Sequence, residues 1–165
     1  MDRCEECGFE YDLGDAMQAG QSIIEGIAEF VAVLKSPDVD VRARPQASTW
    51  SPLEYGCLLR DVLLIQRERV LTARRADRPS FHSMGRDERV EHDGYAEQHP
   101  CDVARQLSDA ASMFANVLNR LGPDEWDRSV MYRYPIRSER SLRWVAVHTV
   151  HEVRHHLRDV RPQRE

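Results

Sequence analysis

The sequence has no apolar run close to the roughly 20 residues that a helix needs to cross a bilayer. Its N-terminal stretch, MDRCEECGFEYD, is acidic and lacks the apolar segment of a secretory signal. We therefore expect a cytoplasmic protein with no membrane partner. The net charge of −5 provides no positive surface for nucleic acid, so no nucleic-acid partner is expected either.

Lysine is almost absent, since Lys35 is the only one, but the resulting bias toward arginine adds no new chemistry. Convincing strand patterns, internal repeats and low-complexity segments are also absent. A chain of 165 residues with 41% hydrophobic residues is long enough to bury the core of one globular domain. The four cysteines are not expected to form disulfides in a reducing compartment, where a C-x-x-C pair indicates metal binding or redox chemistry.

Four segments have the apolar spacing of amphipathic helices. The second begins with a strong signal, because Ser51 can cap it, Pro52 suits its first position and Glu54 completes a capping box. Ser141 is the expected cap of the last. The polar loop 77–99 is predicted to hold a short helix at 87–91, and the connector 123–138 a brief hairpin. The expected fold is an all-α four-helix bundle over 15–161 with two long crossover connections. A short Cys-containing arm, residues 1–14, precedes it. The helices are predicted at 15–36, 51–75, 100–121 and 141–161.

The arm contains Cys4 and Cys7, followed by Gly8 and Phe9. A C-x-x-C pair followed by glycine and an aromatic residue is typical of a zinc knuckle, in which a tight turn points both thiolates at one ion. A thioredoxin-like redox motif would follow a strand, and none is predicted before it. Two free surface thiols remain an alternative.

The last helix carries four of the seven histidines, within residues 148–156. A helical wheel places Glu152 and His156 at one edge of its apolar face. His151 and His155 lie toward the opposite side, and His148 falls between the two pairs. Each pair has the i, i+4 spacing that lets two side chains reach one ion, and we expect the two pairs to point in different directions and not to share a metal.

The inner pair, Glu152 and His156, is predicted to form a metal site at a bundle seam, or else a buried ion pair. The outer pair, His151 and His155, would complete a Cys₂His₂ zinc site with Cys4 and Cys7 if the arm lies on this helix. The alternative for the outer pair is a solvated helix face beside an unconnected tail.

The WSPLE segment at 50–54 and the HHLRD segment at 155–159 resemble the DinB superfamily of four-helix bundles. The resemblance covers roughly 15–161. This family includes metal-dependent, thiol-using enzymes such as the mycothiol-dependent maleylpyruvate isomerases and the bacillithiol S-transferases. The resemblance implies a metal-binding enzyme of the transferase, isomerase or hydrolase type that uses zinc or another divalent metal, and a low-molecular-weight thiol as cosubstrate. It also implies a homodimer.

Carried over by residue, Glu152 and His156 match the Glu-x-x-x-His metal pair of the isomerases, and we expect them to be catalytic. The family's remaining ligand, a histidine eight residues after the tryptophan, corresponds to Leu58, which cannot bind metal. His148, one turn before Glu152, is a further candidate ligand for this site.

For a small-molecule substrate, Arg60 is the expected anion-binding residue and Tyr95 is expected at the pocket mouth. Cys57 is a candidate nucleophile if an imidazole lies within reach. A di-iron site is not predicted, because its paired Glu-x-x-His motifs are missing. The alternative to an enzyme is a non-catalytic binding bundle that retains only a structural zinc.

Overall fold

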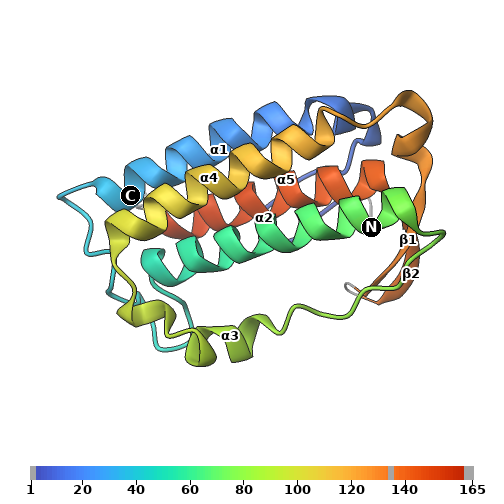
Figure 1. Cartoon of the computed structure of the whole chain (residues 1–165). Coiled ribbons are helices and arrows are strands. Elements are labelled where there is room, and N and C mark those ends of the chain that lie inside the picture. The colour runs from blue at the N-terminus through green and yellow to red at the C-terminus, as the bar shows by residue number, and fades with distance from the viewer. Residues whose placement is uncertain (1–2, 134–135, 162–165) are drawn as a thin grey trace.

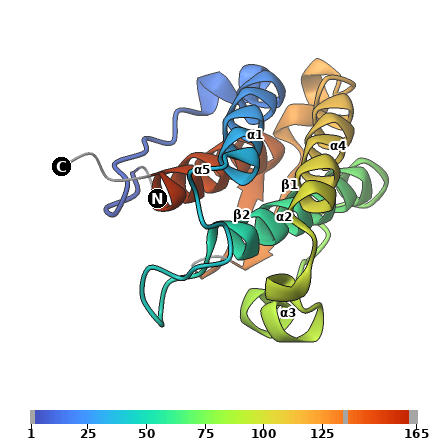
Figure 2. The same cartoon turned by 90° about the vertical axis from the view of Figure 1, so that its left-hand side faces the viewer.

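The computed structural model describes residues 3–133 and 136–161 and confirms the predicted four-helix bundle. Four long helices pack side by side (Figure 1). Seen end-on, α1 and α4 form one layer over α5 and α2 (Figure 2). Because α4 and α5 lie at opposite corners, the chain between them must cross the end of the bundle. The long helices are α1 (Ala19–Lys35), α2 (Pro52–Arg75), α4 (Pro100–Leu118) and α5 (Leu142–Val160).

The two helices that carry the site begin as the sequence predicts. The Ser51 hydroxyl accepts a hydrogen bond from the Glu54 amide (3.2 Å), and the Glu54 carboxylate accepts one from the Ser51 amide (2.8 Å). The Ser141 hydroxyl accepts from the amide of Trp144 (3.2 Å). These caps satisfy backbone donors that would otherwise lack partners at each helix start.

The smaller elements differ from the predictions mainly at their ends. The first helix begins as a 3-10 segment, Leu13–Gln18, capped by the Asp12 carboxylate, before it becomes α1. The predicted short helix is present as α3 (Arg86–His92). The hairpin lies slightly later than expected, with β1 (Ser129–Arg133) antiparallel to β2 (Arg137–Ser141). The loop 77–99 runs below the bundle through α3 (Figure 1).

Close packing of α1 on α5 depends on Gly26. A Cβ at this position would lie 2.7 Å from Cγ1 of Val153, which is closer than real Cβ contacts. Glycine therefore lets the two helix backbones approach, and this fixes α5 against the core.

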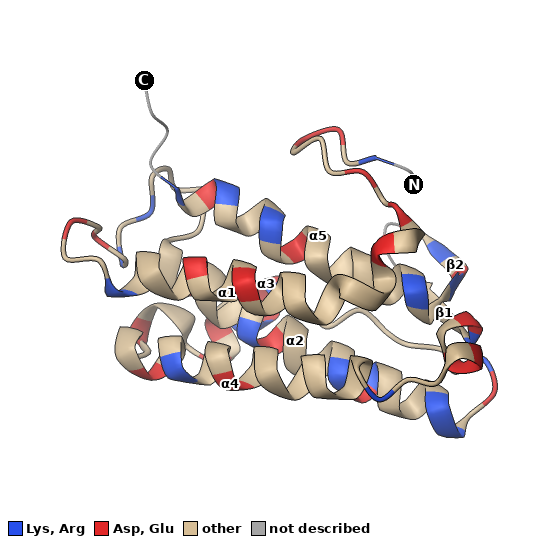
Figure 3. Ribbon diagram, turned by 90° about the horizontal axis from the view of Figure 1, so that it is seen from above, with Lys and Arg blue, Asp and Glu red and all other residues tan. Residues whose placement is uncertain are grey.

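The N-terminal arm lies beside α5 (Figure 3). Its residues 4–9 form a tight turn in which the Cys4 amide donates to the Phe9 carbonyl (2.8 Å) and the Gly8 amide donates to the Cys4 carbonyl (2.9 Å). Gly8 has a φ of 75°, a conformation that favours glycine. Tyr11 then reaches α5, where its hydroxyl lies 2.9 Å from Nδ1 of His151.

Acidic and basic residues are interspersed along the helices (Figure 3). Across the described residues, no helix combines the length and the apolar character required to span a bilayer.

Candidate metal centre on the last helix

A cavity of about 940 Å³ lies beside α5. Its walls come from five parts of the chain: α5, one face of α2, the segment 83–88 before and within α3, strand β1, and the start of the arm. The functional side chains of the wall are Cys4, Gln66, Arg69, Tyr132, His148, His151, Glu152, His155 and His156.

Glu152 is the centre of the histidine cluster. One carboxylate oxygen, Oε1, lies 3.5 Å from Nδ1 of His151 and 3.8 Å from Nε2 of His148. The other, Oε2, lies 3.9 Å from Nε2 of His156. Burial alone would raise the pKa of Glu152, but the contacts with these imidazoles outweigh it and hold the pKa at about 2. At neutral pH this residue is therefore a carboxylate.

His156 is oriented by its neighbours. Its Nδ1 lies 3.0 Å from Oδ2 of Asp159, and its ring stacks on Tyr55 with centroids 4.7 Å apart. Burial favours a raised pKa for Asp159, but its hydrogen bond with His156 is stronger and lowers that pKa. An ionised Asp159 can only accept, so Nδ1 of His156 donates this hydrogen bond, and Nε2 is the nitrogen that faces Glu152.

Leu58 lies deep in the core, with 1% of its surface exposed. It shares one face of α2 with Tyr55 and Val62, so the position is directed toward α5 but carries no donor.

Three groups in residues 3–133 and 136–161 bring at least three donor atoms within 4.8 Å of one another, and none of them joins Glu152 to His156. These groups are Cys4, Cys7, His151 and His155; His148, His151 and Glu152; and His155, His156 and Asp159.

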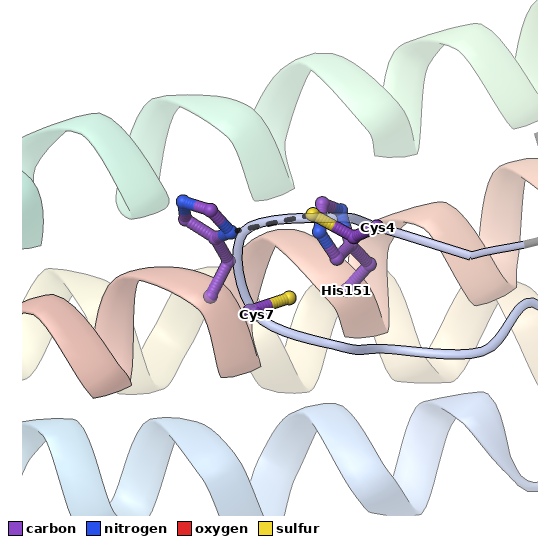
Figure 4. A group of neighbouring side chains, drawn as sticks. Cys4, Cys7 and His151 are labelled. Carbon is purple, nitrogen blue, oxygen red and sulfur yellow. Dashed lines mark hydrogen bonds between the residues drawn. The ribbon is translucent and has the colours of Figure 1, made fainter.

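The structure brings together the four donors of the expected Cys₂His₂ set. The turn of the arm passes over α5, with Cys4 and Cys7 close to His151 (Figure 4). Sγ of Cys4 lies 3.9 Å from Nδ1 of His155. Burial favours a higher pKa for Cys4, but hydrogen bonding from the Cys7 backbone and the approach of the His151 ring lower it to about 7.

The structure does not support the alternative of a solvated face for His151. This residue is 4% exposed, because the arm covers this side of α5. The inner and outer pairs lie closer together than the helical wheel suggests, since the Glu152 carboxylate contacts both His151 and His156. Long side chains bridge the angle that separates their Cα positions on the helix.

The two expected substrate-binding residues lie away from this cavity. Tyr95 is fully buried and its hydroxyl donates to Oδ2 of Asp61 (2.7 Å). Arg60 donates to Asp61 (2.8 Å) and to Asp93 (3.1 Å). Arg60 follows Leu58 by two residues, about 200° around the helix, so it faces the segment 93–98 instead of α5. The pair stabilises that segment rather than lining the pocket mouth.

Cys57 is also unsuited to the nucleophilic role. It is fully buried, and this burial raises the pKa of its thiol to about 12. Its Sγ lies 3.6 Å from the side-chain oxygen of Gln98 and 3.9 Å from the carbonyl of Tyr95, neither of which is an imidazole.

Sequence reasoning missed three polar residues of the cavity wall. Arg69 donates to the Tyr132 hydroxyl (2.9 Å), and Gln66 donates to the same hydroxyl (2.8 Å). A signal for two of them was present, because Val62, Gln66 and Arg69 recur at i, i+4 and i+7 on the face of α2 that carries Leu58. Tyr132 reaches the site from the hairpin, and no spacing in the sequence indicates that contact.

Comparisons with known proteins agree with this architecture. The family model of the DinB superfamily matches residues 24–160. Among solved structures, YfiT from Bacillus subtilis, described as a probable metal-dependent hydrolase with an unusual four-helix bundle topology, superposes with a TM-score of 0.76 at 13% identity. The match covers 96% of this chain and 89% of that one. A search of the curated proteins gave no match. Since the family model spans most of the chain, this protein belongs to the DinB superfamily.

Proposed function

We propose that this protein is a metal-dependent enzyme that acts on a small molecule in the cavity beside α5. The observation that carries the proposal is the arrangement of Glu152 and His156. An ionised carboxylate and an imidazole held by Asp159 point at each other across 3.9 Å on the wall of a cavity of about 940 Å³. The description of YfiT as a probable metal-dependent hydrolase supports the same class of chemistry.

The donors fit a divalent ion with open coordination positions. Ligand atoms about 2.1 Å from a common ion lie roughly 3–4 Å apart, as Oε2 of Glu152 and Nε2 of His156 do. Leu58 supplies no third ligand from α2, so we place His148, which faces the other carboxylate oxygen, as a supporting group. A bound zinc or similar ion would polarise a water or a thiol and lower its pKa.

The surrounding residues suit a substrate with an anionic group. Arg69 lies on the wall opposite α5, and its guanidinium is held by the Tyr132 hydroxyl and by the His82 carbonyl (2.7 Å). Held in this way, the charge can bind a carboxylate or phosphate without losing side-chain entropy on binding. Tyr132 and Gln66 would orient the polar part of the same molecule. Hydrolysis and thiol-dependent transfer or isomerisation are both compatible with this arrangement.

Leu58 favours one alternative, a bundle that binds a small molecule without catalysis. A buried leucine at the family's ligand position is what a lost metal site would leave behind. In that case the protein would retain only a structural zinc, and the cavity would bind its ligand without activating water or a thiol.

Metal titration with a matched variant separates these readings. Metal-free protein is titrated calorimetrically with Zn²⁺, Mn²⁺ and Co²⁺, and hydrolysis of ester, amide and phosphate substrates is assayed with and without added low-molecular-weight thiol. We expect Glu152→Gln to weaken one binding event at least tenfold and to abolish any activity found. The control is Glu25→Gln, a change of the same type at an exposed position on α1. Identical titrations for wild type and Glu152→Gln would refute the catalytic site.

A further inference from the structure

We propose that Cys4, Cys7, His151 and His155 bind a structural zinc ion that fixes the N-terminal arm onto α5. This site goes beyond the proposed function, because its cysteines come from the arm and its role is to hold the fold. The four donor atoms all lie within 4.8 Å of one another, and two of the residues are separated from the other two by more than 140 positions.

The donor spacing is close to that of a loaded site. With Zn–S of about 2.3 Å and Zn–N of about 2.1 Å, tetrahedral donors lie roughly 3.3–3.8 Å apart. Sγ of Cys4 and Nδ1 of His155 are 3.9 Å apart. All four donors lie within 4.8 Å of one another, so side-chain torsions that draw them together by at most about 1 Å would complete the geometry.

The arm has the backbone of a metal knuckle. Hydrogen bonds between Cys4 and Phe9, and from Gly8 back to Cys4, close a turn that directs both cysteine side chains toward α5. The left-handed Gly8 permits the tight return of the chain.

The side chains of His151 and His155 provide evidence for a bound ion that does not depend on the conformation of the arm. Nδ1 of His151 is engaged by the Tyr11 hydroxyl (2.9 Å) and faces Glu152 (3.5 Å). Its Nε2 is buried and has no hydrogen-bond partner within the described part of the chain. A buried nitrogen without a partner is unfavourable, and a bound ion would satisfy it.

His155 shows the same division between its two ring nitrogens. Nε2 faces the carboxylates of Glu6 (3.4 Å) and Asp159 (3.8 Å), while Nδ1 faces Cys4. Zinc-binding histidines commonly present one nitrogen to the metal and donate the other to an oxygen partner. Both imidazoles of the group meet this description.

Four protein ligands fill a tetrahedral zinc, so no position remains for water or substrate and the site is structural. Two thiolates also neutralise the charge of Zn²⁺ in a partly buried place. Because Arg3, Cys4, Glu5 and Glu6 form part of the cavity wall, the ion would hold that wall in position. Loss of zinc should therefore free the arm and open the cavity.

Cobalt substitution and elemental analysis test the site directly. We compare wild type with Cys4→Ser/Cys7→Ser, and use Cys101→Ser, an exposed cysteine on α4, as the control. Wild type and the control should each carry one tightly bound zinc and, after exchange, show thiolate-to-cobalt charge-transfer bands with the intense visible bands of a tetrahedral site. The double variant should lose both signals while circular dichroism shows an intact bundle.

The two proposals fail independently. Glu152→Gln should keep the thiolate–cobalt bands even if it loses the cavity metal. Equal zinc content in wild type and Cys4→Ser/Cys7→Ser, or a cobalt spectrum without thiolate bands, would overturn the structural site. If the double variant does not fold, His155→Gln removes one ligand on α5 and leaves both cysteines of the arm in place. Its zinc content and cobalt spectrum are then measured in the same way. Unchanged zinc affinity in that variant would also overturn the structural site.

Discussion

Glu54 provides a stability test that follows from the start of α2, the helix whose Tyr55 stacks on His156. Its side chain is 2% exposed and accepts hydrogen bonds from Arg44 at both oxygens, from Nη2 (2.5 Å) and Nε (2.9 Å), and from the Ser51 amide (2.8 Å). In Glu54→Gln one oxygen becomes an NH₂ group, which must face either the guanidinium or the amide. One donor is then left without its acceptor.

The expected loss is about 2–3 kcal/mol. A charge-assisted hydrogen bond contributes roughly 1.5–3 kcal/mol, and an unsatisfied donor costs about 1–3 kcal/mol more. Arg44 is 40% exposed, so water partly compensates and the sum is reduced. For a protein of 165 residues this corresponds to a fall in Tm of roughly 4–12 °C.

Urea denaturation followed by circular dichroism measures this change. The control is Glu68→Gln, because Glu68 lies on the same helix but is 66% exposed. That variant should stay within about 0.5 kcal/mol of wild type. A loss below about 1 kcal/mol for Glu54→Gln would refute the reasoning, since the capping box would then carry little of the stability assigned to it.

The ion pair of Glu54 with Arg44 also predicts how the free energy of unfolding changes with pH. Burial would raise the pKa of Glu54, but the hydrogen bonds from Arg44 and Ser51 lower it below its ordinary value of 4.5. A lowered pKa in the folded state stabilises the protein above the unfolded value, and this contribution is lost as pH falls. The difference between wild type and Glu54→Gln should therefore be constant above about pH 5.5 and shrink below about pH 4.5. A difference that grows on acidification would contradict the assignment.

Two further substitutions test the packing and the site. Gly26→Ala improves helix propensity by about 1 kcal/mol, but its Cβ meets Val153 at 2.7 Å, so overpacking should leave a net destabilisation of about 1 kcal/mol in urea denaturation. A more stable variant would show that α1 and α5 are less tightly packed. Leu58→His should add a third ligand to Glu152 and His156 and raise divalent-metal affinity at least tenfold by calorimetric titration. Unchanged affinity would mean that the cleft no longer has the family geometry.

The fold was largely predictable because its signals are local. The box at Ser51 and Glu54 and the cap at Ser141 mark helix starts, and apolar spacing marks the buried faces. The 3-10 start at residues 13–18 was not predictable in the same way. The hydrogen bond from the Gly14 amide to the Asp12 carboxylate is local, but the 3-10 segment also packs against α5, and that packing is a tertiary arrangement.

The site was predictable only where spacing along one helix determined it. The Glu152 and His156 pair follows from i, i+4 spacing, and the composition of the Cys₂His₂ set follows from counting donors. The sequence did not indicate that the arm buries His151, or that Arg69 and not Arg60 lines the cavity. Both depend on which face of each helix meets another element. A helical wheel gives relative angles but not the direction of the neighbours.

Metal content per chain tests the central claim most directly, that α5 carries metal centres. Elemental analysis of protein purified without chelators can be scaled to sulfur, because each chain contains four cysteine and five methionine sulfurs. We predict one zinc for these nine sulfurs that resists dialysis, and a second divalent ion that a chelator removes first. Protein that is folded but contains no stoichiometric metal, before and after incubation with Zn²⁺, would contradict the account.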